Sequence, residues 1–210
     1  MPAKNSVKKF VENGYYHLYN RGVEKRNIFL DEHDYAVFLS LLKRYLDPTI
    51  AYKGSDPHPL SKEIDLLVFC LMPNHFHLFA KQKTITGITK LIRALCTNYV
   101  MYFNKKYDRV GTLFQGKYKA VMVENDIYFL HLSRYIHLNP YPGSDPREYK
   151  YSSYSYFLGD KKSEWLKPAE ILAFFKTAQR VYMKNHSSYQ SFVDDYREDS
   201  EKLLTGLILE

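Results

Sequence analysis

The sequence contains few of the features that mark secreted, membrane-spanning or zinc-bound proteins. Its 210 residues include only two cysteines, Cys70 and Cys96. This number and spacing form neither a disulfide framework nor a zinc motif, so we expect two buried free thiols and a reducing compartment. Residues 1–11 are basic but lack an apolar segment, which argues against a signal peptide. No apolar run approaches membrane-spanning length, and we therefore expect a cytoplasmic protein that does not bind membranes.

Acidic residues are relatively scarce in the first part of the chain. Residues 1–150 contain 22 Lys and Arg against 14 Asp and Glu, a net charge of +8, whereas residues 151–210 contain 8 against 9. A basic body is typical of proteins that bind a polyanion, most often nucleic acid, although a merely soluble basic protein has the same composition. The 20 tyrosines and 13 phenylalanines can pack in a core or stack on nucleobases.

The apolar pattern predicts one antiparallel sheet with helices packed against it. It indicates strands at 15–19, 64–72, 75–80 and 118–123, and helices at 31–46 and 86–107. The resulting order is the βαββαβ pattern of a ferredoxin-like fold, in the α+β class. A further helix is expected at 127–138, and a helical tail follows, with a helix at 168–183.

A pair of histidines begins the second strand of the predicted hairpin. Pro73 and Asn74 have turn chemistry, and His75 and His77 then lie two residues apart on a strand. Alternation directs both imidazoles to one face, about 6–7 Å apart at the Cα atoms, and Phe76 to the other. Such a pair can converge on one cation or phosphate, although ordinary hairpin histidines share the pattern. We interpret His17 as a half-buried strand histidine, which a central strand would bring near this pair.

The helix at 127–138 offers a second group of polar side chains. Tyr135 and Asn139 lie one helical turn apart, so a phenol and a carboxamide project together, and Pro140 ends the helix. A packed aromatic and a helix-end cap would give the same spacing. Phe129, Leu132 and Ile136 form the face expected to be buried.

Basic and aromatic residues alternate between Lys90 and Lys119, where seven Lys and Arg accompany a single acidic residue. This pattern is typical of a groove that follows phosphates and stacks bases, and some of these residues also fit a solvated helix end. The candidate nucleic-acid-binding residues are Arg93, Arg109, Gln115, Lys117 and Lys119.

Several blocks in order resemble the single-tyrosine HUH transposases of insertion sequences. His75-Phe76-His77 is similar to the HUH motif (His, hydrophobic, His) of that family, and the likeness is closest to the REP-associated tyrosine transposases. The similar blocks extend over about residues 15–159 and comprise residues 19–22, 72–77, 102–107, 111–116, 134–140 and 152–154.

The resemblance implies an enzyme that cuts and rejoins single-stranded DNA, at hairpin-flanked sites, through a 5′-phosphotyrosine. It makes Tyr135 the nucleophile, and His75 and His77 the ligands of Mg²⁺ or Mn²⁺. Asn139 takes the place of a third ligand that is often Gln in relatives. Residues 1–160 would form the nuclease domain and residues 161–210 a helical extension, in a monomer or a homodimer. His131 and Lys119 are the candidates for a general base.

Two other functions are compatible with the same residues. A replication initiator or relaxase-like nuclease uses the same histidine and tyrosine chemistry. A non-catalytic ferredoxin-like nucleic-acid-binding module would leave the histidine pair unexplained, and it lacks the closely spaced strand aromatics of RNA-binding modules. Metal binding would separate the enzyme from the binding module.

The charge pattern predicts strongly salt-dependent binding to single-stranded DNA, because displaced counterions drive association. Replacing Lys117 and Lys119 by Gln should weaken binding and flatten the slope of log K against log salt by about 0.7 for each phosphate that is no longer neutralised. Fluorescence anisotropy on single strands, hairpins with single-stranded flanks and blunt duplex of equal length tests this. Equal affinity for blunt duplex, or an unchanged slope, would contradict the expectation.

Overall fold

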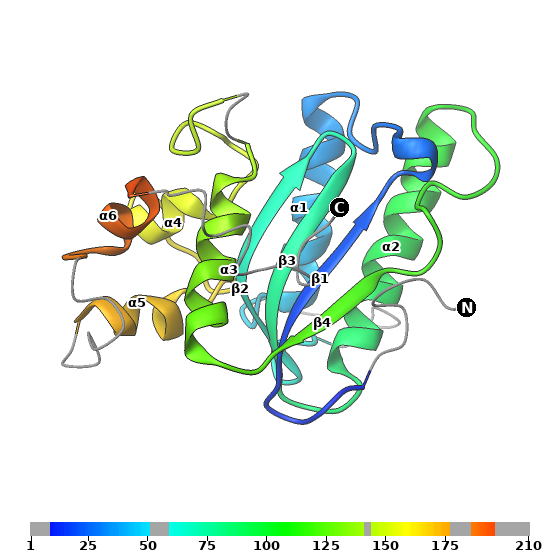
Figure 1. The fold of residues 1–210 in the computed structure, drawn as a ribbon. Helices are drawn as coiled ribbons and strands as arrows, with labels where there is room; N and C mark the ends of the chain where they lie inside the picture. Colours follow the sequence, from blue (N-terminus) through cyan, green and yellow to red (C-terminus); the bar gives the residue numbers. More distant parts are fainter. Residues whose placement is uncertain (1–8, 51–58, 141–143, 177–185, 196–210) are drawn as a thin grey trace.

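The computed structural model describes residues 9–50, 59–140, 144–176 and 186–195. Four strands form one antiparallel sheet in the order β2-β3-β1-β4 (Figure 1). Their bounds are β1 Tyr15–Arg21, β2 Ile64–Met72, β3 His75–Gln82 and β4 Lys119–Val123. The predicted α+β class and antiparallel sheet are confirmed.

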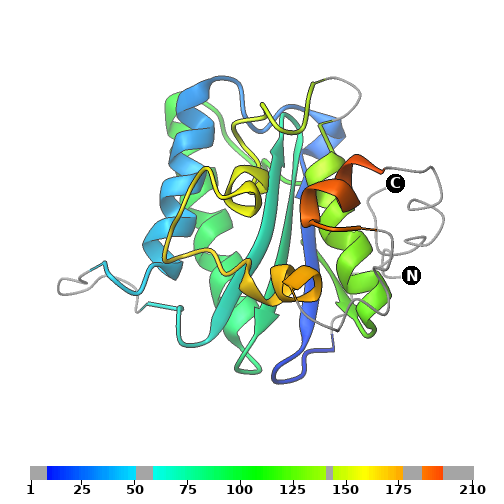
Figure 2. The ribbon, with the colours of Figure 1, turned by 90° about the vertical axis from the view of Figure 1, so that its left-hand side faces the viewer.

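Helices cover both faces of the sheet (Figure 2). The long helices α1 (Glu32–Leu46) and α2 (Gly87–Lys106) pack on one face, and α3 (Asp126–Leu138) packs on the other. The shorter helices α4 (Tyr154–Leu158), α5 (Ala169–Lys176) and α6 (Tyr189–Asp194) lie on the α3 side. A one-turn 3-10 helix, η1 (Val23–Lys25), follows β1. Part of the predicted helix at 168–183 lies outside the described residues.

Strand alternation divides the apolar side chains between two cores. Phe76 points to the α1 side, where its ring centroid lies 5.3 Å from that of Phe38. Phe79 points to the α3 side and makes an edge contact with Phe129 at 5.1 Å. The predicted direction of Phe76 and the predicted buried face of α3 are therefore confirmed, since Phe129, Leu132 and Ile136 are all buried.

The segment after α3 covers the open edge of β2. Backbone hydrogen bonds join Leu71 N–H to the Tyr151 carbonyl at 2.9 Å and Lys167 N–H to the Leu66 carbonyl at 2.8 Å. Pairing an edge strand in this way removes a site of self-association. None of the described helices is long and apolar enough to cross a membrane.

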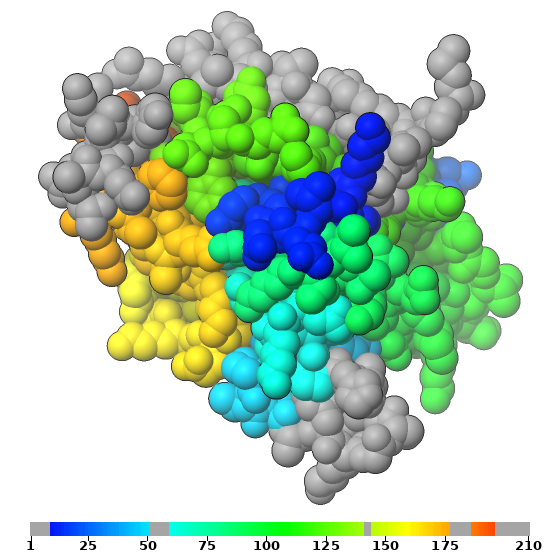
Figure 3. Space-filling view, turned by 90° about the horizontal axis from the view of Figure 1, so that it is seen from below, coloured from blue at the N-terminus to red at the C-terminus, as the bar shows by residue number. Residues whose placement is uncertain are grey.

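Helix α5 lies beside the start of β1 when the molecule is seen from below (Figure 3). Glu170 of α5 accepts hydrogen bonds from the Tyr15 hydroxyl at 2.5 Å and from Lys81 Nζ at 2.8 Å.

Of the two cysteines, Cys70 is buried and Cys96 is half-buried, and both are free thiols.

The start of α1 is fixed by an acidic capping box. Asp31 caps the helix, as predicted, by accepting from the Asp34 N–H at 3.0 Å. The Asp34 carboxylate is fully buried and accepts from Tyr102 and Tyr107 hydroxyls and from Lys106 Nζ, each at 2.8 Å. Burial acts to raise the pKa of Asp34, but Lys106 and the hydrogen-bond donors outweigh it and hold this pKa below its ordinary value. Asp34 thus connects α1 to α2.

We expect Asp34→Asn to lower the free energy of unfolding by about 2–3 kcal/mol at pH 7, because an amide replaces a buried carboxylate that accepts three hydrogen bonds, one of them from Lys106, which keeps Asp31 as its other partner. The folded-state pKa lies below the unfolded value of about 4, so this contribution is present above pH 4 and is lost as the pH falls through the folded-state pKa. Urea unfolding at pH 7 and pH 3 measures both effects. The exposed Glu32→Gln serves as control, with a change within about 0.5 kcal/mol. An equal loss for Asp34→Asn at both pH values would contradict the expectation.

Candidate active site

The two histidines of β3 face α3, as their spacing predicts. His75 is half-buried and His77 is fully buried, and their ring centroids are 4.9 Å apart. The register of β1 against β3 places Arg21 opposite His75 and Tyr19 opposite His77. Cross-strand partners share a face of the sheet, so these side chains surround one position.

Helix α3 brings the predicted tyrosine and amide to the histidines. The helix begins at Asn125, whose side chain accepts from the Tyr128 N–H at 2.9 Å. Ten residues later, the Tyr135 ring makes an edge contact with the His77 ring at 5.7 Å. One turn further, Asn139 Oδ1 lies 3.1 Å from His75 Nε2. The structure therefore brings together all four residues predicted from the sequence.

The contacts of His75 indicate that its Nε2 offers a lone pair toward Asn139 Oδ1. Burial lowers the pKa of His75, so the neutral ring has a single N–H. Asn74 Nδ2 donates to the Lys25 carbonyl at 3.3 Å, which turns Asn74 Oδ1 toward His75 Nδ1 at 2.6 Å. The proton therefore belongs on Nδ1, and the bare Nε2 faces Asn139 Oδ1. Asn139 Nδ2 donates to the Tyr135 carbonyl at 3.5 Å, which favours this amide orientation.

His77 has a buried nitrogen in the same place. Its Nδ1 lies 2.8 Å from His17 Nε2, and its Nε2 has no hydrogen-bond partner among the described residues. Burial, together with His75 and His17, holds the pKa of His77 well below its ordinary value. A buried polar atom without a partner is destabilising, which makes it a marker of a site where a ligand binds.

These donors fit a divalent cation. The separation of 3.1 Å between His75 Nε2 and Asn139 Oδ1 is close to the roughly 3.0 Å between adjacent ligands in an octahedron with bonds of about 2.1 Å. Amide oxygen suits Mg²⁺ and Mn²⁺, whereas imidazole more often binds transition-metal ions. Among the described residues, no group of three or more His, Cys, Asp or Glu side chains is placed to hold a metal ion.

The sequence pattern does not assign His17 and Arg21 to the site, although both lie near it. The sequence predicts a half-buried His17, but this side chain is fully buried, because β1 is a central strand and the Tyr135 ring of α3 contacts the imidazole. Arg21 lies beside His75 and contributes to the lowered pKa of that histidine. Alternation along residues 17–21, combined with the register against β3, is the signal that would have identified both.

The predicted nucleic-acid-binding residues separate into three places. Lys119 is the β4 partner of Tyr19, in the same row as His77, and Gln115 accepts from Arg21 Nε at 2.7 Å. Arg93 and Lys117 line a cavity of about 510 Å³ on the α2 side of the sheet. Arg109 lies after α2, and its guanidinium donates to Asn104 Oδ1 at 3.3 Å.

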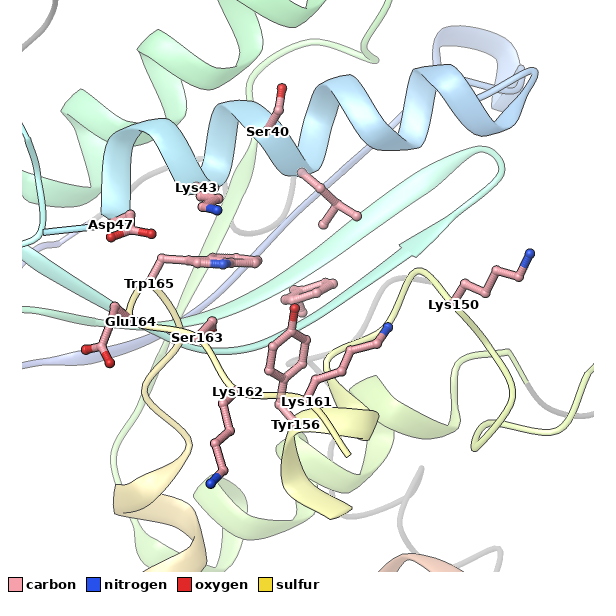
Figure 4. A pocket seen from close by; sticks show the side chains of 12 residues that line it. Ser40, Lys43, Asp47, Lys150, Tyr156, Lys161, Lys162, Ser163, Glu164 and Trp165 are labelled. Atoms are coloured by element: carbon pink, nitrogen blue, oxygen red, sulfur yellow. The ribbon is translucent and has the colours of Figure 1, made fainter. Parts of the chain in front are cut away.

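Another cavity, of about 360 Å³, lies between α1, β2 and residues 161–165 (Figure 4). None of the predicted site residues lines it. Lysines on its rim are accompanied by acids: Lys150 pairs with Glu32 at 3.3 Å, and Asp47 and Glu164 are lining residues. Its lysine charge is therefore partly balanced, and we assign no role to it.

Ser153 and residues of α6 contact a second side of α3. His137 contacts the Tyr189 hydroxyl and Ser153 Oγ, both at 2.7 Å, and Arg134 Nη1 donates to the Phe192 carbonyl at 3.0 Å. His131 accepts from Arg134 Nη2 at 2.9 Å, and burial together with Arg134 lowers its pKa to about 4. His131 is therefore directed toward the tail, which argues against the base role considered for it.

Comparison with known proteins finds a family match over part of the chain. Residues 57–139, which extend from before β2 to the end of α3, match the family model described as "Transposase IS200 like". A search of curated proteins finds no match. The resemblance to transposases predicted from the sequence is confirmed over this segment, which contains all four residues brought together at the site.

One of two similar solved structures shows the same fold. A REP-associated tyrosine transposase bound to a REP hairpin aligns with a TM-score of 0.53 at 11% identity, over 76% of this chain and 88% of that chain. A candidate transposase from Deinococcus radiodurans R1 aligns with a TM-score of 0.39 at 13% identity, over 65% of this chain and 95% of that one.

Proposed function

We propose that this transposase-like protein is a metal-dependent endonuclease and strand transferase that acts on single-stranded DNA. The proposal depends on one observation, the convergence of Tyr135, His75, His77 and Asn139 from β3 and α3. All four belong to one chain, so a monomer contains the complete site, although a homodimer is compatible with it. We propose Mg²⁺ or Mn²⁺ as the cofactor, because both accept oxygen ligands and phosphate at the positions that the protein leaves open.

In the proposed reaction the Tyr135 oxygen attacks the scissile phosphorus. A bond forms between that oxygen and phosphorus, and the bond to the 3′ oxygen breaks, which leaves a 5′-phosphotyrosine and a free 3′ hydroxyl. The phenol loses its proton, and the departing 3′ oxygen gains one. A phenol is a weak nucleophile until it is positioned, and the edge contact with His77 restricts the Tyr135 ring.

The metal ion, when bound, polarises the phosphate and offsets the negative charge that develops on it. Arg21 lies in the row of His75 and Lys119 in the row of His77, and both add positive charge on the same face. Because the covalent intermediate preserves a phosphoester bond, a 3′ hydroxyl can attack it in the reverse direction and rejoin the strand.

We further propose that the DNA substrate contains a hairpin beside the cleavage point. The related transposase was solved with a REP hairpin, and its fold matches over 76% of this chain. The cavity with Arg93 and Lys117 lies on the α2 side, away from the histidines, and includes Phe114 and Tyr118. It is suited to a flanking segment, because cations track phosphates and aromatic rings stack on bases.

Cleavage should require a divalent cation held by His75, His77 and Asn139. We expect His77→Ala to reduce the cleavage rate at least about 100-fold, and excess chelator to abolish cleavage by the wild type, because the charge on the phosphate is then not offset. Added Mn²⁺ should restore the wild type but not the variant. His33→Ala, on the exposed surface of α1, is the control. Full cleavage in excess chelator would refute the metal requirement.

Removal of the Tyr135 hydroxyl should abolish chemistry while preserving the fold. Tyr135→Phe retains the ring, so we expect it to fold and bind DNA but to give no cleavage and no covalent adduct. With wild type and a suicide oligonucleotide, a label on the 3′ side of the cut should travel with the protein. Tyr128→Phe, a substitution two turns earlier on α3, should still form the adduct.

Mass spectrometry of the trapped adduct identifies the modified tyrosine among the 20 in the chain. Tyr19 is the nearest competitor in space, since its ring centroid lies 5.9 Å from that of His77. An adduct on Tyr19 or Tyr128, or cleavage by Tyr135→Phe, would show that the nucleophile is assigned wrongly.

A further inference from the structure

His17 contacts the buried histidine of the proposed metal site from outside that site. Its Nε2 lies 2.8 Å from Nδ1 of His77, and the two rings are nearly parallel, at 20° with centroids 5.0 Å apart. Both residues are fully buried. A nitrogen–nitrogen distance of 2.8 Å is a hydrogen bond, which requires that one nitrogen carries the proton and the other offers a lone pair.

The two possible proton positions have different consequences for His77. If His17 donates, the neutral His77 ring carries its own proton on Nε2. That N–H would then be buried without an acceptor, and the nitrogen could not bind a cation. If His77 donates from Nδ1, its Nε2 is a bare lone pair directed to the place where the His75 and Asn139 lone pairs converge. Only the second arrangement gives a ligand.

We propose that His17 is a positioning residue that accepts the Nδ1 proton of His77 and so fixes the tautomer in which Nε2 can bind the metal ion. This inference rests on the metal site proposed above. In most metal sites a carboxylate or a backbone carbonyl accepts the hydrogen bond from the second ring nitrogen of a metal-binding histidine. Here the imidazole of His17 would be the acceptor.

The location of His17 suits this role. It lies on β1, which is hydrogen-bonded on both sides by β3 and β4, so its backbone is fixed. Tyr19 stacks at a tilt over the same ring at 4.8 Å, and Tyr135 contacts its edge at 6.4 Å. The ring is thus held by neighbours on the strand and on α3, which limits the orientations it can adopt.

Nitrogen-15 NMR of histidine side chains in the metal-free protein tests the tautomer directly, at a pH where His77 is neutral. We expect wild-type His77 to be protonated on Nδ1. In His17→Phe, which keeps a ring but removes the acceptor, the His77 signals should shift toward the Nε2-protonated form. His17→Gln offers an amide oxygen at a similar reach and should restore the wild-type signals. Unchanged His77 signals in His17→Phe would overturn the inference.

Binding of Mn²⁺ alone, followed by calorimetry or electron paramagnetic resonance, provides a second measurement without DNA. Loss of such a supporting hydrogen bond typically weakens metal affinity about 10–100-fold, and we expect His17→Phe to fall in that range. His17→Gln should remain within about tenfold of the wild type, and His33→Phe should be unchanged. Equal weakening by Phe and Gln would show that His17 acts only in packing.

The two measurements separate this inference from the proposed function. If wild type binds no Mn²⁺ and cleaves no DNA, the proposed function fails, and the inference, which depends on that metal site, fails with it. If wild type binds Mn²⁺ and cleaves DNA while His17→Phe keeps the wild-type tautomer and affinity, the function stands and the inference fails.

Discussion

The register between β1 and β3 is the constraint on which the candidate site depends. Alternation places His75 and His77 on the α3 face and Phe76 in the core beneath α1. A slip of one residue would exchange these faces, because the side-chain period of a strand is two. It would put two imidazoles into the apolar core and turn the phenylalanine toward α3. The same burial that fixes the register therefore fixes the direction of the proposed ligands.

The second requirement is that α3 packs on the sheet at a fixed position along the strands and with a fixed rotation about its own axis. Its apolar face sets the rotation, since Phe129, Leu132 and Ile136 are buried against β2 and β3. Its other side is held by polar contacts to later segments, through His137 and Arg134. Helices α5 and α6 contribute to the same core as α3. Helices α5 and α6 are thus part of what holds the proposed nucleophile in place.

Local sequence patterns were sufficient to predict the elements and to place each pair of candidate site residues on one face of its element. Periods of 2 and 3.6 residues located the strands and helices, and the Asp31 cap located the start of α1 to within a residue. His75, His77, Tyr135 and Asn139 were found because each pair lies on one short element. The resemblance to a family then joined the two pairs, which no local pattern could have done.

Residues whose role depends on pairing between strands were not assigned. His17 and Arg21 lie on β1, and their proximity to β3 follows only from the order β2-β3-β1-β4. The basic residues at 90–119 are interleaved with aromatics along the chain, and this pattern predicts a single nucleic-acid-binding groove. Lys117 precedes β4 and lines a cavity on the α2 side, whereas Lys119 begins that strand and faces α3. Linear spacing does not distinguish two faces when a turn lies between the residues.

The charge of the proposed site follows from the burial of its ligands. His75 and His77 are held neutral, chiefly by burial, and the third candidate ligand is an uncharged amide. Carboxylate ligands would partly neutralise the charge of a divalent cation. Neutral imidazole and amide ligands would not, so the full positive charge of the cation would be available to the phosphate. A phosphodiester has one negative charge and gains a second in the transition state, so the undiminished charge matches the reacting group. Neutral ligands also attract the cation less strongly than carboxylates do, so metal and DNA should assist each other in binding.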